Sequence, residues 1–257
     1  MKHAIKHIAL CCCFVVLAKW AHAQVTVNTD MLRQKFNCQV KQLSQFIDRF
    51  NYTEAVQPPD NSKPCRAKNI ASLFNYKDTA LTGNPKALEF LNFVSNDSNG
   101  IKLSLYNTNW FAVVNCSFIY DSKEVFVDLF LRLENYKNNK GYQWIIAGVK
   151  SKIFDFTGKA GSPDVFINPM NHEVNFTELS RALDEKSNLH LYTDGSYQPD
   201  ALSIFLFLAQ KGILHFNQIN TTEFRFLQVP NWKFTVKNFN RTGYNTGWLI
   251  SEISKTN

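Results

Sequence analysis

The stretch from Pro199 to Ile253 constrains the fold of this chain more than any other. It opens with a run of apolar residues that stops at Gly212, which predicts one apolar helix. Four segments rich in β-branched and aromatic residues follow, separated by short polar turns. These expected strands lie at Leu214–Phe216, Thr222–Val229, Trp232–Phe239 and Gly247–Ile253. Because short turns favour antiparallel pairing, the stretch predicts a helix followed by an antiparallel meander.

An earlier stretch, Pro85–Val149, repeats this plan. Asn84 followed by Pro85 predicts a helix start, since proline at the first helical position loses no hydrogen bond. The strands expected after this helix lie at Ile101–Leu105, Asn109–Tyr120, Val125–Tyr136 and Tyr142–Val149. The two stretches share their first and last landmarks: Pro85-Lys86-Ala87-Leu88 matches Pro199-Asp200-Ala201-Leu202, and Trp144-Ile145-Ile146 matches Trp248-Leu249-Ile250. This agreement in order and spacing indicates an internal duplication.

Further helices are expected outside the two stretches. Apolar residues recur at spacings of three and four from Asp30 to about Phe50, and Arg66–Asn75 shows a shorter pattern of the same kind. Asn175 with Glu178 three residues later predicts a capping box. We expect the first helix to pack on the sheet of the first half, and the helix after Pro199 on the sheet of the second. The residues expected at these contacts are Phe36, Val40, Leu43 and Ile47, and Leu202, Phe205, Leu206 and Leu208.

The first 23 residues are typical of a signal peptide. Lys2 and Lys6 precede a short apolar run, and Ala21-His22-Ala23 places small residues before a cleavage point at Gln24. An uncleaved anchor is the alternative interpretation. We therefore expect an exported protein, periplasmic or secreted, with a signal peptide at 1–23, a first module at 24–150, a linker at 151–171 and a second module at 172–257. The linker assignment rests on its glycines and prolines.

The order of helices followed by a curved antiparallel meander in each half resembles the NTF2-like (cystatin-like) α+β roll. The chain is also similar to uncharacterised exported bacterial proteins that carry two such modules. This similarity rests on Ser72-Leu73-Phe74-Asn75, Trp110-Phe111-Ala112, His172-Glu173-Val174-Asn175-Phe176, Phe226-Leu227-Gln228-Val229 and Gly247-Trp248-Leu249-Ile250. The resemblance implies an α+β fold of two tandem NTF2-like rolls, each with N-terminal helices packed on a curved antiparallel sheet. It implies no particular activity.

Charge and cysteine content exclude several classes of protein. Cleavage after Ala23 removes three lysines and no acidic residue, which leaves 25 basic and 21 acidic residues and a net charge of +4. These charges are dispersed, so nucleic acid is not expected as a partner. Cys38, Cys65 and Cys116 remain, an odd number that predicts no disulfide framework; a Cys38–Cys65 bridge and three free thiols both stay open. No later run is long and apolar enough for a transmembrane helix.

Residues with the patterns of known catalytic sites are scarce. The mature chain has three histidines, His172, His190 and His215, and none has a partner at metal-ligand spacing. No glycine-rich phosphate loop or nucleophile elbow is present, so no metal, cofactor or catalytic residue is assigned. Enzymes with the roll fold, which the chain resembles, place an aspartate beside a histidine or tyrosine inside the cone. Asp128 is the one strand carboxylate that invites this role, and a surface ion pair is the favoured interpretation.

One face of the strand Val125–Tyr136 is the best candidate for a binding surface. The opposite face is wholly aliphatic and should cover helices, whereas this one mixes aromatic and charged side chains, as a partly wet interface does. The candidate site residues are Phe126, Asp128, Phe130, Arg132, Glu134 and Tyr136. We expect this face either to join the two modules as a pseudo-dimer or to bind an external protein partner. In the pseudo-dimer it would meet Lys233, Thr235, Lys237, Phe239 and Arg241 of the second half.

Three functional hypotheses follow from these patterns. The first is an exported, non-catalytic protein that binds a protein partner or a small ligand in the cell envelope. The second is an enzyme with a cone-shaped pocket, of the isomerase or dehydratase type. The third is a carbohydrate-binding protein that uses exposed Trp110 or Trp232. A deep cavity with a carboxylate near a histidine or tyrosine would favour the second, and flat exposed rings the third.

Overall fold

A computed structural model gives the fold of this chain. It describes residues 39–54, 63, 65–77, 81–136, 141–154, 167–170, 177–184, 189, 191–194, 200–242 and 245–256. These residues form helices and one antiparallel sheet, which confirms the α+β class. The described residues do not confirm two tandem rolls, because their six strands belong to a single sheet.

Most of the helices follow the capping and apolar patterns of the sequence. The helix expected from Asp30 to about Phe50 begins only at Leu43 within the described residues, because Val40 forms a bridge to Gly247. They are α3 (Leu43–Phe50), α4 (Arg66–Ser72), α5 (Pro85–Ser95), α6 (Thr177–Asp184) and α7 (Ala201–Gln210), with the short 3₁₀ helices η1 (Asp97–Asn99) and η2 (Lys152–Phe154). Helix α5 begins at Pro85 as predicted, and the Asn84 side chain accepts a hydrogen bond from the Lys86 amide. Helix α7 is capped in the same way by Asp200. The side-chain oxygens at both positions satisfy amides that have no partner within the helix.

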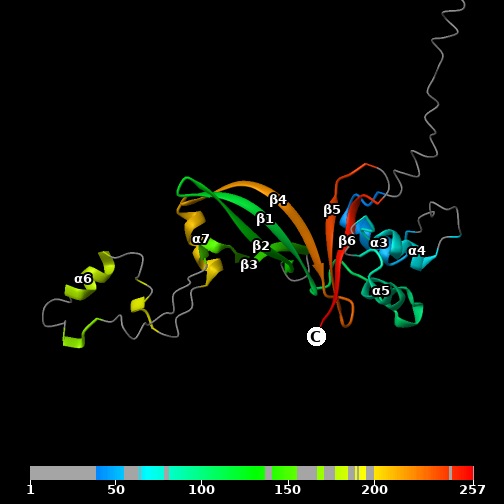
Figure 1. Ribbon diagram of the computed structural model, residues 1–257, viewed down its shortest axis with the longest axis horizontal. Helices are drawn as coiled ribbons and strands as arrows, with labels where there is room; N and C mark the ends of the chain where they lie inside the picture. Colours follow the sequence, from blue (N-terminus) through cyan, green and yellow to red (C-terminus); the bar gives the residue numbers. More distant parts are fainter. Residues whose placement is uncertain are drawn as a thin grey trace, which may run out of the picture.

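The strands are arranged symmetrically about the centre of the sheet. They are β1 (Trp110–Tyr120), β2 (Lys123–Tyr136), β3 (Gly141–Lys150), β4 (Leu214–Phe226), β5 (Trp232–Phe239) and β6 (Gly247–Lys255). Their order across the sheet is β3-β2-β1-β4-β5-β6. Two three-stranded meanders, one from each half of the chain, therefore join edge to edge along the antiparallel β1–β4 pair. Figure 1 shows these two central strands arching side by side.

The N-terminal helices pack mainly on strands of the second half, so the packing of the first helix expected on the sheet of the first half is wrong. Phe36, one of the residues expected at that contact, lies outside the described residues. Phe46 and Phe50 from α3 and Phe90 from α5 are fully buried with Phe226 and Phe234 of β4 and β5. The edge of β6 is paired as well: the Val40 amide donates to the Thr246 carbonyl, and the Ile250 amide donates to the Leu73 carbonyl. In Figure 1, α3, α4 and α5 lie beside β5 and β6.

Helix α7 belongs to the second half of the chain but packs on strands of the first half. Phe205 meets Phe118 of β1 edge to face at 5.6 Å and Phe154 of η2 at 6.3 Å. Leu202 and Leu208 pack against the same cluster, so their expected packing on the sheet of the second half is wrong. Leu206, which was also expected to be buried, is 41% exposed. Alternate residues of a strand point to the same face of a sheet, so both groups of helices can pack on one face at different positions along β1. Trp110, in the N-terminal helix cluster, and Cys116 and Phe118, in the α7 cluster, lie on the same face of β1.

Two of the predicted strands differ from the structure. The expected strand Leu214–Phe216 and the first part of the expected strand Thr222–Val229 belong to one continuous strand, β4, which ends at Phe226. The expected strand Ile101–Leu105 is not extended sheet; Leu103 is buried there, and its amide and carbonyl bond the side chain of Asn51 instead of a neighbouring strand. A side-chain amide can take the place of the hydrogen bonds from a neighbouring strand because it offers both a donor and an acceptor.

Candidate functional site

The candidate site is a cleft where β4 and β5 separate. The two strands pair only over Glu223–Phe226 and Phe234–Lys237. Beyond Glu223, β4 follows β1, while β5 follows β6. The resulting cleft has a volume of about 720 Å³, within the range of small-molecule sites. It is lined by Gln39, Val40, Lys41, Ile219, Asn220, Thr221, Thr222, Glu223, Lys237, Asn238, Phe239, Asn240, Gly247 and Trp248.

The cleft lining combines many neutral polar groups with a few apolar ones. Amide and hydroxyl side chains come from the middle of β4 and from the end of β5 and the residue after it, and they offer both hydrogen-bond donors and acceptors. Trp248 supplies an indole ring that packs against Phe224 at 4.8 Å, so a neighbouring side chain holds its orientation. Phe239 lies under the Arg241 guanidinium at 5.0 Å. This mixture suits a ligand with polar groups and at least one apolar surface.

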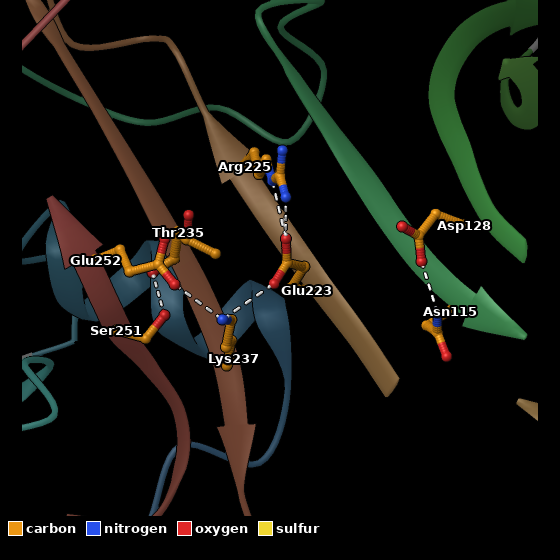
Figure 2. Close-up of polar contacts among 8 residues, drawn as sticks. All are labelled: Asn115, Asp128, Glu223, Arg225, Thr235, Lys237, Ser251 and Glu252. Atoms are coloured by element: carbon orange, nitrogen blue, oxygen red, sulfur yellow. Dashed lines mark hydrogen bonds and ion pairs between the residues drawn. The ribbon is translucent and has the colours of Figure 1, made fainter. Parts of the chain in front are cut away.

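A row of four charged side chains closes the cleft where β4 and β5 begin to pair. We name Arg225, Glu223, Lys237 and Glu252 the charged row; Figure 2 shows it crossing from β4 through β5 to β6. Arg225 donates to Glu223 Oε1 from Nε at 2.8 Å and from Nη2 at 2.6 Å. Lys237 Nζ lies 3.2 Å from Glu223 Oε2 and 2.9 Å from Glu252 Oε1. Both oxygens of Glu223 are therefore engaged by cations.

The charged row keeps Lys237 protonated. Burial of the ammonium by itself would lower the pKa of Lys237. Hydrogen bonds to Glu252 and Glu223, with the charges of both carboxylates, outweigh burial and raise the pKa above its usual value. A lysine held in this state is a fixed charge and not a proton acceptor at neutral pH.

The lining residues lack the pairing that general acid–base catalysis needs. Among the described residues that line the cleft, Glu223 is the one carboxylate, and none is a histidine or tyrosine. His215 lies exposed at the start of β4, whereas His172 and His190 fall outside the described residues. Within the described part of the chain, no three histidine, cysteine or carboxylate side chains come close enough to hold a metal ion. The arrangement suits binding better than proton transfer.

The structure places the predicted site residues on β2, apart from the cleft. Phe126 is 55% exposed, and Phe130 packs 6.2 Å from Phe111 of its own half. Asp128 accepts a 2.6 Å hydrogen bond from Asn115, as Figure 2 shows. The exposed Arg132–Glu134 pair, at 3.9 Å, adds little stability. Tyr136 ends the strand.

The predicted pseudo-dimer contact through this face is not formed, because the halves join along the β1–β4 edges. Lys237, expected opposite Asp128 and Glu134, pairs with Glu223 and Glu252. Two strands, β1 and β4, separate β2 from β5 in the sheet. An external protein partner for the face of Phe126 stays a prediction.

The two tryptophan rings on which the carbohydrate-binding hypothesis depended are buried. Trp110 is 2% exposed and Trp232 is 4% exposed, so neither offers a flat surface. Cys65 and Cys116 are free thiols, and Cys38 lies outside the described residues. Burial, with a smaller contribution from Asp128, raises the pKa of the Cys116 thiol. That thiol therefore stays protonated and belongs to the core.

Comparison with protein-family models, curated proteins and solved structures gives no match. The cleft between β4 and β5 is therefore identified as a candidate site by its geometry alone. Among the described helices, none combines the length and apolar composition needed to cross a bilayer.

Proposed function

We propose that the protein is an exported, non-catalytic binding protein that holds a small ligand or a segment of a protein partner in the β4–β5 cleft. The parting of the two strands beyond Glu223 and Lys237 carries this proposal, since it leaves a cleft of about 720 Å³. The engaged carboxylate of Glu223 supports binding over the alternative of a cone-pocket isomerase or dehydratase. A carbohydrate would have to use Trp248 in place of the two buried tryptophans.

The proposed origin of the fold is a duplication of an NTF2-like (cystatin-like) module, with the modules at 24–150 and 172–257 and a linker at 151–171. The mirrored strand order supports it, because each half contributes one meander to the sheet. The reciprocal packing of α5 and α7 supports it further. In this proposal the halves form a pseudo-dimer joined at β1 and β4 that has exchanged its helices.

A cleft-filling substitution tests the proposed binding site. Asn238 is exposed and lines the cleft, so Asn238→Trp should occupy the space without disturbing the core. Native mass spectrometry would compare the folded variant with the wild type after incubation with a low-molecular-mass extract of the source cells. We expect a bound mass on the wild type that the variant loses.

The matched control is Lys233→Trp, which adds the same ring at an exposed position of β5 outside the cleft lining. This control should keep the bound mass. Equal binding to all three proteins would place the site elsewhere, and binding to none would remove the support for a small ligand of the source cells.

Export is tested by the intact mass of the protein purified from its native source. We expect the mature chain to begin at Gln24, because Ala21-His22-Ala23 fits a signal-peptidase site. A chain that retains Met1, or that carries lipid on a cysteine, would contradict this expectation.

A further inference from the structure

One edge of β4 is unpaired along most of the strand. From Leu214 to Thr222, β4 pairs with β1 on one side, and no described strand pairs with its other side. All seven consecutive residues there, from 215 to 221, are exposed. The backbone amides and carbonyls of such an edge form a template for another extended chain.

The faces beside this edge differ in polarity. Register with β1 places Phe216 and Ile219 opposite Phe118 and Cys116, on the face that also bears Trp248. Phe216 and Ile219 are about 60% exposed, so both side chains are open to a ligand on this face. The other face presents the polar side chains of His215, Gln218 and Thr221.

Two bulges shape the edge and leave it accessible. Asn217 and Asn220 are the extra residues of β4 at the register shifts with β1. Their side chains turn back toward β1: Asn220 donates to Asn115 Oδ1 at 3.0 Å, and Asn217 donates to Ser117 Oγ at 3.1 Å. Bulges bend a strand and increase its twist, which discourages pairing with a long, flat strand of another sheet. A short, adaptable chain is the better fit.

We propose that the β4–β5 cleft binds an extended peptide, which adds to β4 as a further strand and has alternating apolar and polar side chains. The apolar side chains would lie toward Phe216, Ile219 and Trp248, and the polar ones toward His215, Gln218 and Thr221. Pairing would stop at Glu223, where β5 takes up the same edge of β4. Main-chain hydrogen bonds supply affinity in this mode of recognition, and alternate side chains supply specificity. The inference rests on the proposed function and names the class of its ligand.

The test uses the full-length mature protein and displayed linear nonapeptides. Peptides are selected on the wild type, with counter-selection on Asn238→Trp, and the strongest binder is synthesised. Two further versions carry N-methyl groups on alternate residues, one version for each parity. An added strand directs every second amide toward β4, so one version should bind at least roughly tenfold more weakly while the other stays within about threefold.

The outcomes separate this inference from the proposed function. Equal effects of the two methylation patterns, or no peptide that distinguishes the wild type from Asn238→Trp, would overturn the strand-addition proposal. If an extract molecule still binds the wild type and Lys233→Trp but not Asn238→Trp, the cleft remains a binding site for another class of ligand. If neither extract nor peptide binds there, both proposals fall.

Discussion

Replacing Gly247 by alanine should destabilise the folded protein by about 2–6 kcal/mol, as measured by urea unfolding. Gly247 has a φ of +89°, a conformation that residues with a side chain rarely adopt. An added Cβ would lie 2.0 Å from the Val40 carbonyl oxygen and 2.7 Å from its carbon. These are backbone atoms held by the Val40–β6 bridge, so they cannot rotate away as a side chain would.

Gly83→Ala is the matched control for this prediction. Gly83 also has a positive φ, +73°, but a Cβ added there would meet no heavy atom within 4 Å. Only backbone strain applies there, and the expected cost is about 1–2 kcal/mol. Equal losses for the two variants would mean that the close approach of Val40 to β6 contributes nothing.

The bridge at Gly247 matters because it joins the N-terminal segment to the last strand of the sheet. The Trp248 amide donates to the Val40 carbonyl at 2.9 Å, shortly before α3 begins at Leu43. A second attachment lies nearby, where the buried Asn245 side chain donates to the Phe74 carbonyl at 2.6 Å. Segments more than 170 residues apart in the chain are thereby fixed together.

Local sequence patterns predicted most of the elements and their exposed and buried faces. The start of α5 at Pro85 follows from the Asn-Pro pair, and the meander of β1, β2 and β3 follows from alternation and short turns. The buried positions Ile47 and Phe205 follow from helical spacing. These features depend only on residues a few positions apart, which a sequence displays directly.

The choice of partner for each helix could not be predicted in the same way. An apolar stripe predicts that Phe46 and Phe205 are buried, but packing on either meander would bury them equally well. The exchange depends on how long connections cross the molecule, which leaves no periodic signal. The bulges of β4 explain why two strands were expected where the structure has one. Asn217 and Asn220 interrupt the alternation of apolar and polar residues and suggest a turn.

The cleft was missed because its lining comes from four separate segments of the chain. Sequence reasoning singled out Phe126 and its neighbours as an interface because aromatic and charged residues alternate there. A usable signal was present in the run Asn217–Thr222, which is too polar for a central strand yet lies between apolar strand segments. Such a run is compatible with a strand that has one unpaired edge.

Replacing Phe205 by alanine should lower the free energy of unfolding by about 3–5 kcal/mol. Its ring is 5% exposed and fills the space between Phe118 and Phe154. Leu206→Ala, one position along α7 at a 41% exposed site, should cost less than about 1 kcal/mol. Urea unfolding of the two variants therefore tests which face of the helix is buried.

Native-state hydrogen exchange of Phe205→Ala tests whether the helices of each half pack on strands of the other half. Because Phe205 belongs to the second half but packs on β1 and η2 of the first, the cavity weakens contacts in the first half. Amides of β1 and β2 should therefore lose protection first, while those of β5 and β6, which are buried under α3 and α5, keep theirs. The reverse order, with β5 and β6 opening first, would mean that α7 packs on its own half and that the helices are not exchanged.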